Sequence, residues 1–165
     1  MNAIVAVDQH WAIGREGELL FSLPSDRKHF RTLTLGGTVI MGRKTLDGFP
    51  GGQPLPDRRN LVITHNLDIQ RQGIEIASSP EQALAAVADC DPDQVWIIGG
   101  GSIYAAFLRR CKRVYLTQVE AAAEDPDTFF PNLDRLPGWS VERRSEPLVE
   151  NGLTYRFVDY VQTDL

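Results

Sequence analysis

The chain has few cysteines and no long hydrophobic run, and both absences narrow its function. Cys90 and Cys111 stand alone, without a CxxC pair or paired histidines, so neither a disulfide framework nor a zinc site is predicted. No apolar run approaches the roughly 20 residues of a membrane helix. Met1–Val7 lacks the basic start of a signal peptide. We therefore expect a reduced, cytoplasmic protein with no bound metal and no membrane partner.

The chain also has fewer basic residues than acidic ones. The 17 Lys and Arg residues are outnumbered by 22 Asp and Glu residues, which gives a net charge of −5. Nucleic acids and membrane surfaces are anionic, so this balance argues against a general binder of either, although a local basic pocket remains open. A length of 165 residues with 42% hydrophobic residues is typical of one globular domain, here expected over residues 1–165.

Short β-branched runs alternate with helical patterns, which predicts βαβ units and a mixed, mainly parallel α/β sheet with flanking helices. The C-terminal region differs, since turn residues separate two strand patterns and favour an antiparallel hairpin. Strands are expected at Ala3–Val7, Thr38–Met41, Leu61–Thr64, Ile74–Ile76, Val95–Ile98 and Val114–Val119, helices at Pro24–Leu35, Arg43–Phe49, Pro80–Ala88 and Ser102–Leu108, and the hairpin at Trp139–Glu146 and Leu153–Val161.

Two stretches have no clear periodicity. Asp8–Leu23 contains Gly14 and Gly17, and Glu120–Leu136 is acidic and contains prolines. Irregular loops of this length are uncommon in a compact domain and are usually functional or mobile. The first stretch is therefore a candidate lid.

Three consecutive glycines follow a predicted strand and open a predicted helix. Gly99, Gly100 and Gly101 carry no Cβ that would block a ligand, and the start of a helix offers unpaired N–H groups to a phosphate. A tight strand-to-helix turn without any ligand is the alternative interpretation. The pattern is not the GxGxxG fingerprint, because Tyr104 occupies the last glycine position.

Two cations open another predicted helix. Arg43 and Lys44 follow Gly42, where the helix dipole favours anions rather than cations. A bound phosphate would reverse that penalty, whereas solvated surface cations would cost only a few tenths of a kcal/mol. Beside the glycine turn, a phosphate site is the better interpretation, and Thr64 and His65 at the end of the next strand could join it.

Asp26 is the most informative acid. With Phe30 and Leu33 it forms an i, i+4, i+7 row, so a carboxylate lies on the apolar face of a helix. An acid in a first helical turn also complements the dipole and needs no other role. If that face is buried beside a ligand, desolvation raises the pKa of Asp26 and lets it hold a protonatable heterocycle.

Together these segments resemble the dihydrofolate reductase family, from Ile4 to near Val161. Each motif is weak alone, but their joint order and spacing are specific. The matching motifs are Ala12-Ile13-Gly14, Leu23-Pro24-Ser25-Asp26 with Phe30, Val39 to Thr45, Pro54 to Asn60, Ile97 to Tyr104, Tyr115-Leu116-Thr117 and Asp127 to Pro131.

The resemblance implies NADPH-dependent reduction of dihydrofolate to tetrahydrofolate, with hydride passing from nicotinamide C4 to pterin C6 and a proton added at N5. It also implies that antifolate inhibitors can bind and that the protein is a monomer. Asp26 would bind the pterin amino group and N3 and favour protonation through water. Thr117 would support Asp26, and Arg58 would clamp the glutamate α-carboxylate, a task suited to a bidentate guanidinium.

The remaining site residues follow from the same resemblance. The Gly99–Gly100 bond is expected to be cis, and Arg43 and Lys44 would recognise the 2′-phosphate that distinguishes NADPH from NADH. The substrate set is Ile4, Val5, Asp26, Arg27, Phe30, Phe49, Leu55, Arg58, Ile98 and Thr117. The cofactor set is Ala6, Ile13, Gly14, Leu19, Gly42, Arg43, Lys44, Thr45, Thr64, His65, Ser78, Ile98, Gly99, Gly100, Gly101, Ser102, Ile103 and Tyr104.

Some positions depart from the family pattern. Phe21, placed in the catalytic set with Asp26 and Thr117, stands where many bacterial members have Trp, so a water held by an indole N–H loses that partner. Arg27 replaces a commoner apolar residue and either points outward or reaches the glutamate tail. Ser102 occupies a site that is often Arg.

Three alternatives remain. A related reductase on this fold could act on another pterin or on a pyrimidine of riboflavin synthesis, but such ligands have no glutamate tail for Arg58. A folate- or nucleotide-binding module without turnover would not need Asp26. A structural domain would leave the glycine turn, the basic helix start and Asp26 as coincidences.

Overall fold

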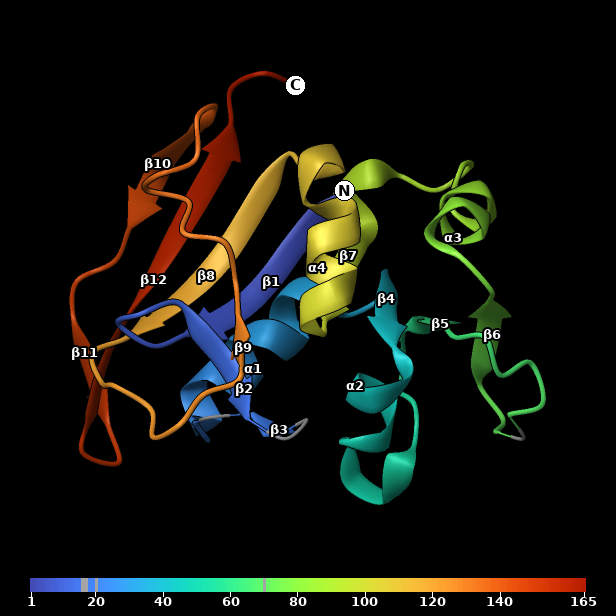
Figure 1. Cartoon of the computed structure of the whole chain (residues 1–165), viewed down its shortest axis with the longest axis horizontal. Coiled ribbons are helices and arrows are strands. Elements are labelled where there is room, and N and C mark those ends of the chain that lie inside the picture. The colour runs from blue at the N-terminus through green and yellow to red at the C-terminus, as the bar shows by residue number, and fades with distance from the viewer. Residues whose placement is uncertain (16–17, 20, 70) are drawn as a thin grey trace.

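Buried aliphatic runs form the central sheet of the protein (Figure 1). The structure is a computed structural model that describes residues 1–15, 18–19, 21–69 and 71–165. Its strands run in the order β10-β12-β8-β1-β7-β4-β5-β6. The neighbours from β8 to β6 are parallel, so the predicted mainly parallel sheet is confirmed. These strands are β1 (Asn2–Val7), β4 (Thr38–Gly42), β5 (Arg59–Ile63), β6 (Ile74–Ala77), β7 (Val95–Gly99) and β8 (Arg113–Val119).

The C-terminal segment forms an antiparallel edge. β10 (Trp139–Arg144) and β12 (Leu153–Gln162) pair as the predicted hairpin, and β12 also pairs antiparallel with β8. The stretch between them was expected to be only a turn. It contains a further strand, β11 (Leu148–Glu150), which pairs with β12. A three-residue strand is too short to show an alternating pattern.

The two stretches predicted to be irregular pair with each other. β2 (Ala12–Arg15) lies between β3 (Glu18–Leu19) and β9 (Thr128–Phe129) in a small second sheet. The prediction of irregular loops was therefore wrong, because long-range pairing ordered strands too short to give a local signal. The buried Asp8 carboxylate joins the same stretches, since it accepts 2.9 Å hydrogen bonds from the N–H groups of Ala12 and Ala123. Residues 16, 17 and 20 of the candidate lid, including Gly17, lie outside the described residues.

Helices cover both faces of the sheet. In Figure 1, α4 lies over the front of the strands and α1 lies behind them. Each predicted helix is present but ends one or two residues earlier than expected, because the last turns leave α-helical geometry. The helices are α1 (Pro24–Thr34), α2 (Arg43–Asp47), α3 (Pro80–Ala86) and α4 (Gly101–Phe107), with 3₁₀ turns η1 (Pro50–Gly52), η2 (Pro92–Gln94) and η3 (Leu108–Arg110). Within the described part of the chain, no helix is long and apolar enough to cross a membrane.

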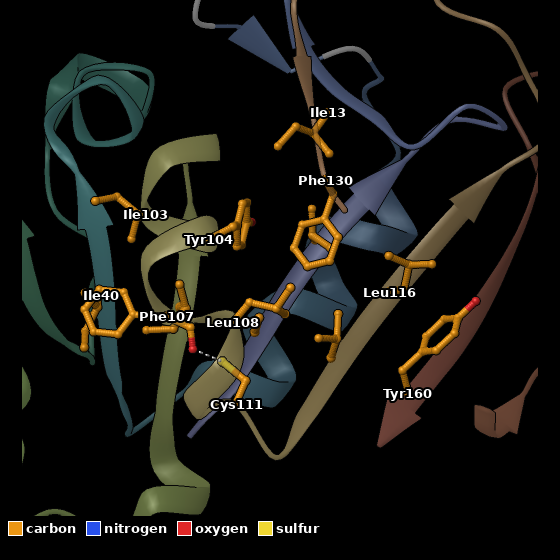
Figure 2. Packing of buried hydrophobic residues seen from close by; sticks show 14 of the residues in the cluster. Ile13, Ile40, Ile103, Tyr104, Phe107, Leu108, Cys111, Leu116, Phe130 and Tyr160 are labelled. Atoms are coloured by element: carbon orange, nitrogen blue, oxygen red, sulfur yellow. Dashed lines mark hydrogen bonds between the residues drawn. The ribbon is translucent and has the colours of Figure 1, made fainter. Parts of the chain in front are cut away.

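Alternating strand residues supply two separate cores. Ile97 of β7 packs in the cluster that contains Phe107 of α4, whereas its neighbour Ile98 packs in the cluster that meets Phe30 of α1, as the period of two requires. Figure 2 shows the α4-side cluster, in which the Cys111 thiol donates to the Phe107 carbonyl at 3.4 Å. Burial raises the pKa of Cys111 to about 12, so this thiol is a packing group rather than a nucleophile.

Candidate active site

The candidate residues meet at the carboxyl edge of the parallel strands. Ala6 near the end of β1 is in register with Thr117 of β8, and Met41 of β4 is in register with Gly99 of β7. Gly42 is level with Ile63, the last residue of β5. In open parallel sheets this edge is where ligands bind. Residues that are far apart in the sequence therefore converge on one site.

Asp26 lies on α1 where that helix crosses the sheet. The hydroxyl of Thr117 donates to its carboxylate at 2.5 Å, so the predicted pairing of these two residues is present. Asp26 is half-buried and Thr117 is buried. Helix α1 places the acid in its first turn, after Pro24.

The electrostatic setting of Asp26 favours a proton. Burial raises its pKa above the ordinary value, and this effect outweighs the hydrogen bond from Thr117 and the positive charges of His29 and Arg27, which lower the pKa. The nearby Glu150 carboxylate raises it further. An acid that keeps its proton toward neutral pH can donate one to a bound ligand.

Partly buried apolar side chains from several segments pack in one cluster that includes the apolar face of α1. Phe30, Phe49 and Leu55 are partly buried and pack against the same cluster, which also contains Ile4 and Ile98 from the central strands. These residues come from five different segments, yet the structure brings all of them together, as expected for a slot that holds a flat heterocycle. Partial exposure leaves their edges available to a ligand.

Tyr104 fixes the main chain at the centre of the site. Its hydroxyl donates to the Ile4 carbonyl at 2.7 Å, and burial raises its pKa. The ring stands edge-on to Phe130, with ring centroids 5.1 Å apart, an arrangement visible in Figure 2. The tyrosine therefore connects α4 to the strand end beside Asp26.

Replacing Tyr104 with phenylalanine is expected to lower the free energy of unfolding by about 1–3 kcal/mol, because it removes a buried hydrogen bond to the Ile4 carbonyl. Urea denaturation measures this change, with Tyr115→Phe as the matched control, since Tyr115 is half-buried at the sheet surface. Equal stability of Tyr104→Phe and the wild type would mean that this hydrogen bond contributes nothing net.

The Arg58 guanidinium already makes two hydrogen bonds within the protein. Its Nε donates to the Pro56 carbonyl at 2.9 Å and its Nη1 donates to the Thr34 hydroxyl at 3.1 Å. Burial and the nearby Arg31 lower its pKa, and Asp57 opposes them. These two bonds hold the guanidinium plane in place while some of its five N–H donors stay available to a carboxylate.

The glycine turn has the geometry of a close-approach site. The Gly99–Gly100 peptide bond is cis, as expected. Gly99 has a φ of 123°, and an added Cβ would lie 3.3 Å from the Tyr104 ring. A Cβ on Gly101 would lie 2.6 Å from Thr128. Gly100 opens α4 with no side-chain cap, so the first N–H groups of that helix are left for another partner.

The predicted phosphate site follows three adjacent strands. Arg43 begins α2 directly after β4, Thr64 follows β5, and Ser78 follows β6, whose last residue is level with the end of β5. Lys44 and His65 are exposed at the same edge. Gly42 caps α2 without a side-chain hydrogen bond. The buried Nε of Arg43 also makes no hydrogen bond, although it lies 3.4 Å from Asp47.

The other predicted residues have varied surroundings. Phe21 is half-buried against the cluster of Leu23, Val119 and Tyr155. Arg27 is exposed and donates to the Ser22 hydroxyl at 2.6 Å, which agrees with the outward alternative. Gly14 pairs through its main chain with Leu19 and Thr128, while the Leu19 side chain lies outside what the structure describes. Val5, Ile13 and Ile103 pack in the α4-side core, Ala6 is half-buried, Thr45 lies near Gly99, and Ser102 is exposed.

Two residues near Asp26 were missed from the sequence. Glu150 accepts two hydrogen bonds from Ser25, and the His29 ring stacks on Phe157 with centroids 4.0 Å apart. Glu150 lies on β11 and Phe157 lies on β12, so both contacts join α1 to the C-terminal strands. No local pattern in the sequence connects these segments. Among the residues described, no group of three or more His, Cys, Asp or Glu could hold a metal ion.

Comparisons with known proteins agree with this arrangement. Residues 1–162 match the family model described as dihydrofolate reductase. Similar curated proteins include dihydrofolate reductase type 3 of Salmonella typhimurium, 40% identical over 147 residues, covering 89% of this chain and 88% of that protein. Another is the dihydrofolate reductase of Mycobacterium tuberculosis, 37% identical over 151 residues, covering 90% and 89%. A solved dihydrofolate reductase from Enterococcus faecalis, complexed with NADP(H) and RAB-propyl, has a TM-score of 0.84 at 32% identity and covers 99% of this chain and 96% of that one.

Proposed function

The chain belongs to the dihydrofolate reductase family, and from that premise we propose that Asp26 is the acid of the reaction, with its pocket assembled at the carboxyl edge of the sheet. The chain is an oxidoreductase that reduces dihydrofolate to tetrahydrofolate with NADPH. One observation supports the residue assignment most strongly. Asp26 is a half-buried carboxyl with a raised pKa, hydrogen-bonded to Thr117, on the same helix as Phe30, which packs in the apolar cluster with Ile4 and Ile98.

Asp26 has two tasks in this proposal. It binds the pterin amino group and N3, which orients the ring, and it favours protonation at N5 through water. The hydrogen bond from Thr117 fixes which carboxyl oxygen points away from the ligand. Phe21, near the same helix start, would shape the solvent-facing side of the pocket. A pKa moved upward by burial keeps the acid supplied with a proton closer to neutral pH.

The other substrate residues bind the rings of the substrate and exclude water from them. Phe30, Phe49 and Leu55 would hold the aromatic rings of the substrate, and removing water from that slot strengthens the interactions of Asp26. The main-chain carbonyls of Ile4 and Ile98 are the proposed acceptors for pterin N–H groups. Val5 follows Ile4 in β1 as a further substrate contact, and the next residue, Ala6, is a proposed cofactor contact. Arg58 would clamp the glutamate carboxylate.

The cofactor residues fit NADPH, which supplies the hydride when it is bound. Gly99, Gly100 and Gly101 leave room that a Cβ would fill, and the uncapped start of α4 offers N–H groups to a pyrophosphate. Arg43 and Lys44 would bind the 2′-phosphate, beside Thr64, His65 and Ser78. The remaining proposed contacts are Ile13, Gly14, Leu19, Gly42, Thr45, Ser102, Ile103 and Tyr104.

Replacing Arg43 and Lys44 together with alanine is expected to shrink the preference for NADPH over NADH by about 10²–10⁴-fold, because each of the two charge-assisted phosphate contacts contributes about 1.5–3 kcal/mol. The ratio of kcat/KM for the two cofactors measures it. The matched control is Arg109→Ala with Arg110→Ala, two exposed cations beyond α4. An unchanged cofactor ratio would contradict the phosphate assignment.

The loss of NADPH absorbance on mixing the protein with NADPH and dihydrofolate tests the reaction itself, with NADH run in parallel. We expect oxidation that requires dihydrofolate and prefers NADPH. A folded protein that binds NADPH but oxidises it only with another pterin, or with a pyrimidine of riboflavin synthesis, would support the alternative reductase.

We also propose that residues 1–165 form one catalytic domain that works as a monomer in the cytoplasm. The free thiols of Cys90 and Cys111 suit a reducing compartment. Members of this family bind antifolates, and the slot beside Asp26 is where such an inhibitor would compete with substrate. Light scattering coupled to size-exclusion chromatography tests the monomer, for which a mass near 18.4 kDa is expected.

A further inference from the structure

The start of α1 is capped from the far end of the chain. Leu23 occupies the cap position and offers no side-chain hydrogen bond. Instead Glu150 of β11 takes both free donors of Ser25, the N–H at 2.9 Å and the hydroxyl at 2.6 Å. A carboxylate at a helix start satisfies unpaired N–H groups and complements the dipole. One side chain from the antiparallel edge therefore fixes the first turn of α1.

That first turn carries Asp26 directly after Ser25. Asp26 itself accepts a hydrogen bond from Thr117 of β8. Thr117 is in register with Phe157 of β12. Since β11 also pairs with β12, Glu150 and Thr117 are attached to the same group of strands. The acid is thus held from two sides by one rigid frame. His29 adds a third contact between α1 and that frame, through its stacking on Phe157.

The charge of Glu150 acts on Asp26 as well. Burial is the main cause that raises the pKa of Asp26, His29 and Arg27 on α1 lower it, and the negative charge of Glu150 adds a smaller upward contribution. From the other elements, Thr117 donates a hydrogen bond to Asp26, the buried Tyr104 of α4 interacts with it electrostatically, and Asp159 of β12 interacts with His29. The two bonds from Ser25 lower the pKa of Glu150, which keeps it ionised at neutral pH.

We propose that Glu150 is a positioning residue for the reaction, which holds Ser25 so that Asp26 meets both Thr117 and the substrate. This inference rests on the proposed role of Asp26. It assigns a contribution to the C-terminal strands, which contact α1 through Glu150 and Phe157.

Single-turnover hydride transfer in Glu150→Ala, Glu150→Gln and the control Glu146→Ala tests the proposal, because this rate is independent of product release. Glu146 is an exposed acid of the same hairpin. We expect Glu150→Ala to transfer hydride about tenfold more slowly, as a small displacement of a catalytic group can cause, with unchanged KM for NADPH. Glu146→Ala should behave as the wild type.

Glu150→Gln separates position from charge. Its amide oxygen can still accept from the Ser25 N–H, so we expect most of the rate at low pH to return. Recovery of the rate in Glu150→Gln, which lacks the negative charge but keeps the acceptor, is the result expected of a positioning residue. If Glu150→Ala folds poorly, Ser25→Ala, which keeps the charge and the main-chain bond, should show a smaller loss of rate and an unshifted pH profile.

A wild-type rate and pH profile in Glu150→Ala, with only a lower melting temperature, would reduce Glu150 to a helix cap and overturn the proposal. A rate in Glu150→Gln as low as that in Glu150→Ala would also overturn the proposal, because the amide would then fail to replace the carboxylate as the acceptor for Ser25. Failure of the underlying assignment is distinguishable, because it appears as normal turnover in Asp26→Asn. Slow turnover in Asp26→Asn with unchanged Glu150 variants overturns the Glu150 inference alone.

Discussion

Asp26→Asn is expected to slow hydride transfer by about 10²–10⁴-fold, the usual effect of losing a general acid. Asparagine keeps the shape and an oxygen that can accept from the Thr117 hydroxyl, but it has no proton to share with a bound heterocycle. Affinity for NADPH should be unchanged, because the cofactor residues lie at the glycine turn and α2. Stopped-flow measurement of hydride transfer gives the rate, and fluorescence titration gives the affinity.

The pH profile distinguishes an acid from a structural carboxylate. Burial raises the pKa of Asp26 in the folded protein, so the wild-type rate should decline as pH rises through that value, whereas the Asn variant should have a slow, flat profile. Glu75→Gln, at an exposed position on β6, is a suitable control and should keep the wild-type profile. Near-normal rates of Asp26→Asn from acid to neutral pH would contradict the assignment of Asp26 as the acid of the reaction.

The same substitution should not destabilise the fold. A carboxyl whose pKa is raised on folding binds a proton more tightly in the folded state, so stability falls as pH rises from the ordinary value of 3.8 through the folded pKa. Above that window the folded protein carries an ionised acid in a partly desolvated place. Removing it should leave the melting temperature at neutral pH equal or higher, which is the usual relation between a catalytic group and stability.

Arg58→Leu is expected to weaken dihydrofolate binding by about 10²-fold, since truncating one partner of a charge-assisted contact costs about 2–5 kcal/mol. A pterin without the glutamate tail should lose little affinity, because it presents no carboxylate to the guanidinium. The comparison of the two ligands by calorimetry removes any general effect of the substitution on the pocket.

Arg58→Lys is the conservative control for that measurement. Lysine retains the charge but cannot bond Pro56, Thr34 and a carboxylate at once as the planar guanidinium can. Its dihydrofolate affinity should therefore lie between those of the wild type and the Leu variant. Equal losses for dihydrofolate and for the tail-less pterin in Arg58→Leu would mean that Arg58 is misassigned.

Local sequence signals predicted the part of the site that lies on single elements. The apolar row of Asp26, Phe30 and Leu33 placed the acid on the buried face of a helix, and α1 confirms that orientation. The glycines after Val95–Ile98 marked the strand-to-helix turn, which is present between β7 and α4. Both features follow from residue type and spacing along a few turns of chain.

Long-range contacts were outside the reach of those signals. The pairing of β2 with β9 and the bonds from Ser25 to Glu150 join segments that no short pattern connects. Glu150 in the sequence is one acid among 22 Asp and Glu residues, and only its position on β11 gives it a partner. Arg27 illustrates the other limit, since the sequence leaves two directions open, and its exposed bond to Ser22 is compatible with either of them.

The alternation along β7 has a consequence for how such a site can change over generations. Ile97 belongs to the core under α4 and Ile98 to the slot beside α1. A substitution at Ile97 mainly changes the core under α4, and a substitution at Ile98 mainly changes the cluster beside α1. Thermal stability and ligand preference can therefore change independently. Inserting or deleting one residue in that strand would exchange the two roles at once. Variation at the heart of this fold is therefore expected to proceed by replacement, with changes of length confined to the connections between strands.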